Sequence, residues 1–369
     1  MRAKDTNDSN ISGGSALLEE RFLQIAGLEG LDSLALVGLS KNAGKTTCLN
    51  HLIRSWEKAA VKRPLGLTSI GRDGEEEDVV GGHAKPKIYI KAGTYLATAR
   101  SSLARSDALL DILELSGIRS AFGEIAICKA VSDGYVELAG PSQAGELYQC
   151  EQALRAQNPQ LFFVVDGALS RRSQAGGGLT QAIILTAGAE SSACPEELAE
   201  KVSHALNLLS IPALKADQAQ KAMQTFRQVE AARAIAVSGG AEYQVKTLEL
   251  PSLVGQSQTV AALLSDEVKT LILRGAITET ICKGLLAEKR FHDLTLAVED
   301  GTRLFITPTS LRRLEKQNIR LAALHPLQVR MVCINPFKAD GSPTDGRAML
   351  KEVKKITQIP VEDYGPALA

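Results

Sequence analysis

A glycine-rich string near the start of the chain has the residue types that bind phosphate. It reads GLSKNAGKTT from Gly38 to Thr47 and lies between an apolar run and an amphipathic stretch. In a strand–loop–helix of this kind, backbone N–H groups such as those of Asn42 and Ala43 point at phosphate oxygens. The helix start adds roughly half a positive charge. Gly44 lets the backbone approach the ligand closely, so the string predicts a nucleotide-binding loop.

Four side chains of this string have separate predicted roles. Lys45 reaches the β- and γ-phosphates, Thr46 offers its hydroxyl to Mg²⁺, and Thr47 donates to the α-phosphate. Lys41 is either an additional phosphate contact or a solvated loop lysine. The alternative to nucleotide binding is a glycine turn that only caps the following helix. The string GxxxxxGKT is one residue longer than the usual phosphate-loop spacing, because the first glycine is Gly38.

Carboxylates for Mg²⁺ are expected at the ends of two strands. Asp166 ends the apolar run LFFVV, a position typical of an aspartate that touches the metal directly or through water. The alternative is a turn aspartate. Asp73 follows the strand LGLTSIG and competes with the acidic run from Glu75 to Asp78. We expect Lys45, Asp73 and Asp166 to be catalytic, and Thr46, Asp166 and Asp73 to hold the metal.

Other residues are less informative. Arg171 and Arg172 follow the Asp166 strand and could contact a phosphate or a partner, or be exposed arginines. Residues 132–134 and 139–142 indicate turns, and we assign them no chemistry. Asn335 ends a strand and could face a site, although a loop role is favoured. The guanine motif NKxD is missing, which favours ATP over GTP.

Alternating strands and helices must position these residues. Up to about Leu214 the pattern predicts a mostly parallel, doubly wound α/β sheet with helices on both faces, the architecture of phosphate-loop NTPases. We expect a disordered tail at 1–14, a phosphate-loop NTPase domain at 15–214 and a smaller α/β domain at 215–369. Three local predictions are a helix over 107–116, a hairpin over 123–142 and a helical stretch over 216–236.

Composition narrows the class of protein. The chain has 369 residues, with 42 Lys plus Arg and 42 Asp plus Glu, so its net charge is zero and attraction to nucleic acid or membrane is not expected. No secretory signal and no run of about 20 apolar residues is present, which predicts a cytoplasmic protein. The six cysteines are scattered, which favours buried thiols over a metal site.

Several strings in the first half together resemble one known family. They are GLSKNAGKTTCLNHLI, LGLTSIGRDGEEEDVV, KPKIYIKAGTYLATA, GEIAICKAVSDGYVELAGPS and FFVVDGALSRRSQA. This combination resembles the phosphate-loop subunit of the lysine 5,6-aminomutase reactivase. The loop spacing is similar to that of the dethiobiotin synthetase and cobyric acid synthase branch of phosphate-loop proteins. The second half has no equally clear resemblance.

The resemblance implies an accessory role. Such a protein uses ATP to release damaged cofactor from an adenosylcobalamin-dependent aminomutase, together with a partner ATPase related to mismatch-repair proteins. Two alternatives stay open: a ligase of the dethiobiotin synthetase or cobyric acid synthase kind, in which ATP activates a carboxylate, and a module that binds nucleotide without turnover. Formation of a homodimer is also left open.

Overall fold

A computed structural model describes most of the chain. The described residues are 21–59, 61–70, 88–120, 122–168, 180–229, 231–238, 244–249, 252–253, 255–262, 264–265, 267–287 and 293–364. They divide into two compact units. The first unit runs to Ala205 and resumes at Val329, and the second unit comprises Leu206–Gln328. The predicted tail at 1–14 lies outside the described residues.

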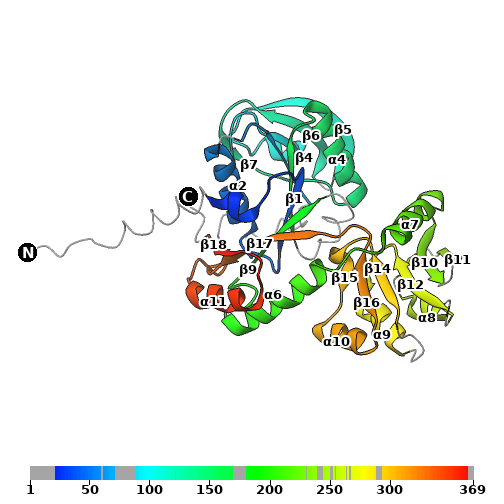
Figure 1. The fold of residues 1–369 in the computed structure, drawn as a ribbon. Coiled ribbons are helices and arrows are strands. Elements are labelled where there is room, and N and C mark those ends of the chain that lie inside the picture. Colours follow the sequence, from blue (N-terminus) through cyan, green and yellow to red (C-terminus); the bar gives the residue numbers. More distant parts are fainter. Residues whose placement is uncertain are drawn as a thin grey trace, which may run out of the picture. The chain divides into compact units, whose positions relative to one another are not determined.

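The first unit is built on a nine-stranded sheet with the order β18-β17-β9-β1-β8-β2-β4-β6-β5 (Figure 1). Strands β9, β1, β8, β2 and β4 pair in parallel in that order, whereas β6 pairs antiparallel with both β4 and β5. The bounds are β1 (Ser33–Gly38), β2 (Leu65–Ser69), β4 (Tyr95–Ala99), β5 (Leu110–Ser120), β6 (Gly123–Ala130), β8 (Phe162–Ala168), β9 (Ala182–Gly188), β17 (Gln328–Asn335) and β18 (Val361–Asp363). The predicted α/β class and mostly parallel sheet are confirmed.

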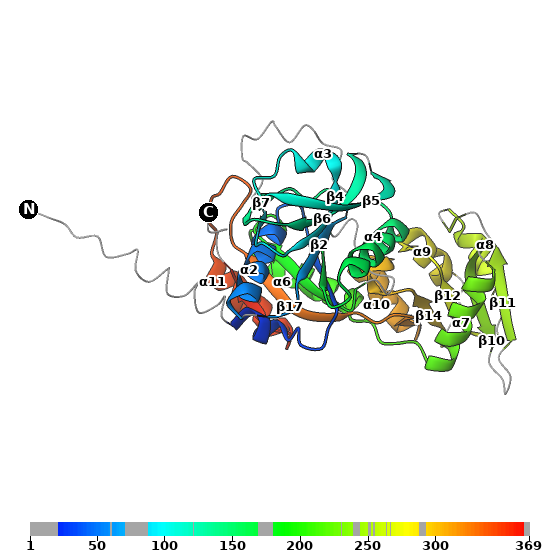
Figure 2. The same ribbon diagram turned by 90° about the horizontal axis from the view of Figure 1, so that it is seen from above.

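The central strands are apolar because both faces of the sheet are covered. Every residue of β1, β2 and β9 is buried. Leu34 and Leu36 of β1 pack with the apolar face of α2 (Lys45–Lys58), including Leu49 and Leu52. Figures 1 and 2 show α2 and α4 (Ala144–Gln157) on opposite sides of this sheet. The remaining elements of the unit are a helical turn at 21–26, α3 (Arg100–Leu103), α6 (Pro195–Leu209), α11 (Gly346–Ile356) and the short ladder of β3 (Ile88–Ile90) with β7 (Gly134–Val136).

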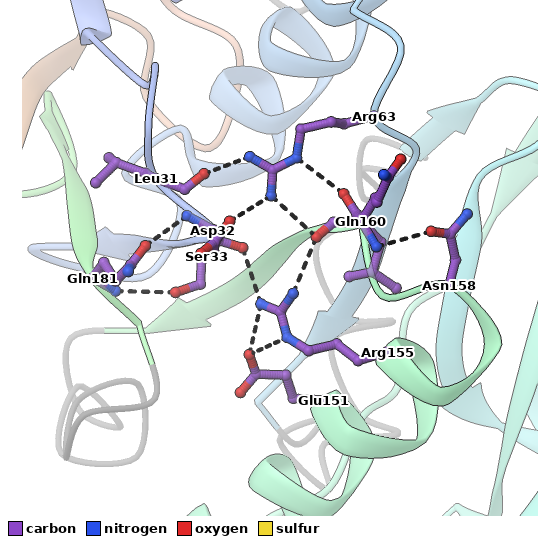
Figure 3. Close-up of polar contacts among 10 residues, drawn as sticks. Leu31, Asp32, Ser33, Arg63, Glu151, Arg155, Asn158, Gln160 and Gln181 are labelled. Atoms are coloured by element: carbon purple, nitrogen blue, oxygen red, sulfur yellow. Dashed lines mark hydrogen bonds and ion pairs between the residues drawn. The ribbon is translucent and has the colours of Figure 1, made fainter.

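The amino ends of the parallel strands are joined by two arginines (Figure 3). Arg63 donates to the carbonyls of Leu31 and Gln160 and pairs with Asp32 at 2.7 Å. Arg155 of α4 donates to the carbonyls of Asp32 and Leu161. Since these residues directly precede β1, β2 and β8, the two guanidinium groups connect three strands at one edge of the sheet. We name it the amino edge.

A single carboxylate completes this network from inside α4. Glu151 is almost fully buried and pairs with Arg155 at 2.8 Å. Burial raises the pKa of the Glu151 carboxyl, while the hydrogen bond and charge of Arg155 act in the opposite direction. The pair therefore places two charges in a poorly solvated position where each depends on the other.

The second unit contains a five-stranded sheet with the order β11-β10-β12-β14-β16. Strands β12, β14 and β16 are parallel, and β10 is antiparallel to both β11 and β12. Separate clusters of buried apolar residues lie on either side of it. The elements are α7 (Ala216–Gln228), β10 (Ala232–Ser238), β11 (Gln244–Glu249), α8 (Ser257–Ala262), β12 (Val268–Leu273), β13 (Ile277–Thr278), α9 (Glu279–Ala287), β14 (Thr295–Val298), η3 (Gly301–Arg303), β15 (Leu304–Phe305), α10 (Pro308–Lys316) and β16 (Arg320–Ala323).

Three local predictions are wrong in instructive ways. Residues 107–116 form no helix, because β5 begins at Leu110 and pairs antiparallel with β6, with two irregularities in the register. Residues 123–142 form no hairpin, because β6 pairs with β4 and β5 whereas β7 pairs with β3. The helical stretch ends at Gln228, and Ala232–Ser238 is β10. In each case the pairing with another strand, and not the local pattern, decided the structure.

The predicted second domain is also too long. The boundary at Leu214 assigned all of 215–369 to it, but β17 and β18 belong to the nine-stranded sheet of the first unit. The second unit therefore lies within the sequence of the first one. The apolar pattern of a segment predicts that it is a strand, but it does not indicate which sheet the strand joins. The return of β17 and β18 to the first sheet could therefore not be predicted from the sequence. Within the described residues, no helix is long and apolar enough to span a membrane.

Candidate functional site

The predicted phosphate-binding string lies at the carboxyl ends of the parallel strands. We name residues 38–47 the glycine loop and this side of the sheet the carboxyl edge. Strand β1 ends at Gly38 between β8 and β9, and α2 begins at Lys45. The Leu39 N–H donates to Thr186 O of β9 over 2.9 Å. The Ser40 hydroxyl lies 2.8 Å from that of Ser191. In parallel α/β sheets this edge is where ligands bind.

The backbone of the glycine loop leaves the start of α2 open. Asn42 and Gly44 have φ angles of 58° and 93°, both in the left-handed region. Gly44 is the N-cap of α2, and no side chain caps this helix. Its first turn contains no acidic residue. N–H groups at the helix start are therefore not occupied by a capping side chain or opposed by a carboxylate, which suits an anionic ligand.

Lys45 extends back over the loop to which it belongs. Its Nζ lies 3.1 Å from the position that a Cβ on Gly38 would occupy. The ammonium group is therefore held at the carboxyl end of β1, and a side chain at position 38 would press on it. Cys48 N–H donates to Gly44 O over 2.9 Å, so helical bonding starts directly at this lysine's turn.

Asp166 brings a carboxylate to the same edge. It lies in β8, paired with Leu36 of β1 and Ser69 of β2. Its Oδ1 is buried and has no hydrogen-bond partner among the described residues. Burial raises the pKa of the Asp166 carboxyl, and the nearby charge of Lys45 acts in the opposite direction. A buried carboxylate oxygen without a partner is costly, so this atom fits a role as ligand to a cation or water.

Of the remaining predicted residues, some are described by the structure and some are not. Thr46 and Thr47 are half-buried in the first turn of α2, and Ala43 is buried in the loop. Lys41 is exposed and takes part in a polar interaction, so both of its alternatives stay open. Asp73 lies outside the described residues, as do the competing acids 75–78 and Arg171 and Arg172.

Metal binding by protein groups alone is not indicated in the described part of the chain. No group of three or more His, Cys, Asp or Glu side chains gathers there. A divalent cation at the carboxyl edge would be coordinated by the Thr46 hydroxyl and the Asp166 carboxylate, with water and phosphate oxygens as further ligands. Mg²⁺ is bound in this manner, through few protein groups and the phosphates of its substrate.

A segment that we expected to be a plain turn lies beside Asp166. Gly140 N–H donates to the Ser69 hydroxyl over 2.9 Å, and a Cβ on Gly140 would lie 1.8 Å from Ser69 O. Ala139 N–H donates to the Thr98 hydroxyl, so the segment crosses the carboxyl ends of β2 and β4. Sequence analysis missed this position. The available signal was a glycine between an apolar pair, Leu138 and Ala139, and a proline.

Asp133 is structural, as a turn assignment predicts. It accepts the Ala92 N–H and pairs with Lys91 at 2.9 Å. The Ala92 bond, followed by the Lys91 bond, lowers the pKa of this carboxyl. This region therefore connects β3 and β7 and takes no part in the glycine-loop site.

Asn335, for which we favoured a loop role, lies against the glycine loop. It is the last residue of β17, and its Nδ2 donates to the carbonyl oxygen of Asn42 over 3.3 Å. A Cβ on Gly44 would lie only 2.8 Å from that of Asn335. The chain thus supplies a side chain to this loop from 293 residues away.

Comparison of the chain with protein-family models, with curated proteins and with solved structures finds no match.

Proposed function

We propose that this chain binds Mg-ATP at the glycine loop and hydrolyses it. The observation that carries the proposal is the pairing of two features at the carboxyl edge. Lys45 folds back over an uncapped helix start, and Asp166 next to it keeps a buried carboxylate oxygen without a described partner. An anion-binding loop beside a cation-binding carboxylate matches the charge distribution of a metal–nucleotide complex.

Each residue has a role in this proposal. Loop N–H groups bind phosphate oxygens. Lys45 neutralises the negative charge that develops on the β- and γ-phosphates while the γ-phosphoryl group is transferred to water. Thr46 and Asp166 would hold Mg²⁺, which supplies Lewis-acid stabilisation of the phosphate oxygens. Asp73 is proposed as a second acid near the metal.

We assign the first unit to the phosphate-loop NTPases of the dethiobiotin synthetase and cobyric acid synthase branch. The parallel sheet, the loop after β1, the Asp166 position in β8 and the GxxxxxGKT spacing support this assignment. The missing NKxD string favours ATP over GTP as the ligand.

The biological role that we propose follows from the resemblance of the sequence strings. The chain would be an accessory ATPase that helps to release damaged cofactor from an adenosylcobalamin-dependent aminomutase, with a partner ATPase related to mismatch-repair proteins. We place this activity in the cytoplasm. The same loop spacing also suits the alternative, a ligase that uses ATP to activate a carboxylate.

The test compares nucleotide binding and phosphate release by the full chain and by Lys45→Ala. Lys62→Ala is the matched control, because Lys62 is exposed beyond the opposite end of α2. We expect Mg-ATP binding that is lost in Lys45→Ala and kept in Lys62→Ala. Phosphate release by the chain alone supports a self-sufficient ATPase. Binding without release supports a subunit that requires its partner. No binding by the unaltered chain would refute the proposal.

The two biological roles are separated by a second measurement. An accessory ATPase produces only ADP and phosphate, and a cobalamin enzyme or partner ATPase accelerates their release. A ligase instead needs a carboxylate, which it converts to an acyl phosphate that hydroxylamine traps as a hydroxamate. Carboxylate-dependent hydroxamate formation would contradict the accessory role.

A further inference from the structure

The side chain of Asn335 is held in one orientation at the end of β17. Its Oδ1 accepts the Phe337 N–H over 3.3 Å, and its main-chain carbonyl accepts the Ala189 N–H over 3.0 Å. Its Nδ2 donates to Asn42 O over 3.3 Å. Both ends of the side-chain amide are thus used, and its backbone is attached to the residue that follows β9.

The bond to Asn42 has a consequence for the next N–H group. A peptide group is planar and trans, so the Ala43 N–H points away from the Asn42 carbonyl oxygen. Holding that oxygen therefore orients the Ala43 N–H, one of the predicted phosphate donors. Asn42 also has a φ of 58°, where any residue other than glycine is less stable than in the right-handed region. A contact from outside the loop stabilises this conformation.

A second contact fixes the same side chain against the helix start. The Cβ position of Gly44 lies 2.8 Å from the Asn335 Cβ and 3.2 Å from its Cγ. Asn335 therefore packs on the bare Cα of the N-cap of α2, with no room for a side chain between them. The hydrogen bond and the packing contact act on two residues that flank Ala43.

We propose that Asn335 is a positioning residue of the glycine loop. It orients the peptide group between Asn42 and Ala43 before ligand arrives, so that less ordering is needed on binding. The identification of the ligand as Mg-ATP rests on the proposed function. The positioning of the loop rests on the contacts above.

The experiment uses the full chain with Asn335→Ala, Asn335→Asp and the control Gln328→Ala. Asparagine and aspartate have nearly the same shape, but aspartate has no donor for Asn42 O. Gln328 is an exposed amide at the other end of β17. Two quantities are measured: the Kd for Mg-ATP, and millisecond hydrogen exchange of residues 39–47 without nucleotide.

Both Asn335 variants should bind Mg-ATP roughly tenfold more weakly, as expected for one lost hydrogen bond and a less ordered loop. Their loop amides should exchange faster than those of the unaltered chain, at a similar unfolding midpoint. Gln328→Ala should match the unaltered chain in both readouts. Weaker binding with unchanged loop exchange would overturn the inference, because Asn335 would then act on the ligand directly. Unchanged exchange and affinity would also overturn it.

Lys45→Ala separates this inference from the proposed function. It should lose Mg-ATP binding while its loop exchange stays near that of the unaltered chain. If neither the unaltered chain nor any variant binds Mg-ATP, the proposed function is refuted. The hydrogen-exchange data then still decide whether Asn335 positions the loop.

Discussion

The two edges of the large sheet use polar residues in opposite ways. At the amino edge, Arg63 and Arg155 donate to carbonyls and carboxylates of the same unit, and the buried Glu151 has its partner. At the carboxyl edge, α2 begins without a capping side chain, and Asp166 Oδ1 has no partner among the described residues. Satisfied polar groups stabilise a fold, whereas polar groups without partners lower stability and remain available to a ligand.

From this difference we expect the amino edge to contribute to stability and the carboxyl edge to bind the proposed ligand. Both edges belong to one sheet and share strands β1, β2 and β8, so the contrast does not arise from different folds or from distance to the core. Substitutions at the carboxyl edge should therefore change nucleotide turnover more than unfolding. Substitutions at the amino edge should do the reverse.

The largest expected effect is on turnover. Asp166→Asn removes the charge at the carboxyl edge and should lower phosphate release about 100-fold or more, since a metal–phosphate complex loses a preorganised charge. Its unfolding midpoint should not fall, because the variant no longer buries a carboxylate. Asp32→Asn makes the same change at the amino edge and should keep the activity. Equal losses in the two variants would contradict the assignment of the edges.

The second effect is on stability. Arg155→Ala leaves the buried Glu151 carboxylate without its partner and removes one hydrogen bond from each of the Asp32 and Leu161 carbonyls, which should lower the free energy of unfolding by about 2–4 kcal/mol. Urea unfolding measures it. Arg105→Ala breaks an ion pair with Glu137 in which the arginine is half exposed, and should cost less than about 1 kcal/mol. The affinity for Mg-ATP should be unchanged in both.

The loss in Arg155→Ala should depend on pH. Burial already raises the pKa of Glu151 above 4.5, and removal of Arg155 removes the groups that lower it. A carboxyl whose folded-state pKa is raised favours the folded state below its unfolded pKa, and this contribution is lost as pH rises through the folded-state value. The stability gap between Arg155→Ala and the unaltered chain should therefore be narrower near pH 5 than near pH 8. A constant gap would contradict the burial of Glu151.

A third change tests the segment beside Asp166. A methyl group on Gly140 would overlap Ser69 O, which no side-chain rotation can relieve, so Gly140→Ala should cost about 1–3 kcal/mol. Gly145→Ala, in the exposed first turn of α4 with open space around it, should stabilise by about 0.5–1 kcal/mol. Thermal unfolding compares them. A neutral Gly140→Ala would mean that this segment does not pack on β2.

The smallest expected effect concerns the hydroxyl contact between Ser40 and Ser191. Ser40→Ala removes one hydrogen bond between partly buried hydroxyls and should cost less than about 1 kcal/mol of stability, with a change in Mg-ATP affinity below about threefold. Titration calorimetry measures the affinity. A larger loss would show that Ser40 contributes directly to the ligand site.

Local sequence patterns were sufficient to predict most helices and strands and the central residues of the candidate site. The strand, glycine loop and helix from Ser33 to Lys58 follow from a short apolar run, a glycine string and an amphipathic repeat, all within 26 consecutive residues. Asp166 was predictable for the same reason, as a carboxylate in an apolar strand. Residues 107–116 were not, because a strand and a helix can share one short apolar pattern until a neighbouring strand pairs with it.

By itself, the sequence was sufficient to predict the α/β class and the positions of the glycine loop, Lys45 and the Asp166 carboxylate at the ends of strands. Each of these depends on residues close together in the chain. Only the tertiary structure decided that β17 and β18 return to the first sheet, that Asn335 contacts Asn42, and that Gly140 packs on Ser69. It also decided which arginines hold the amino edge together. These contacts join residues far apart in the chain. Local propensity contains no information about which distant strand, pleat face or register will bring them together.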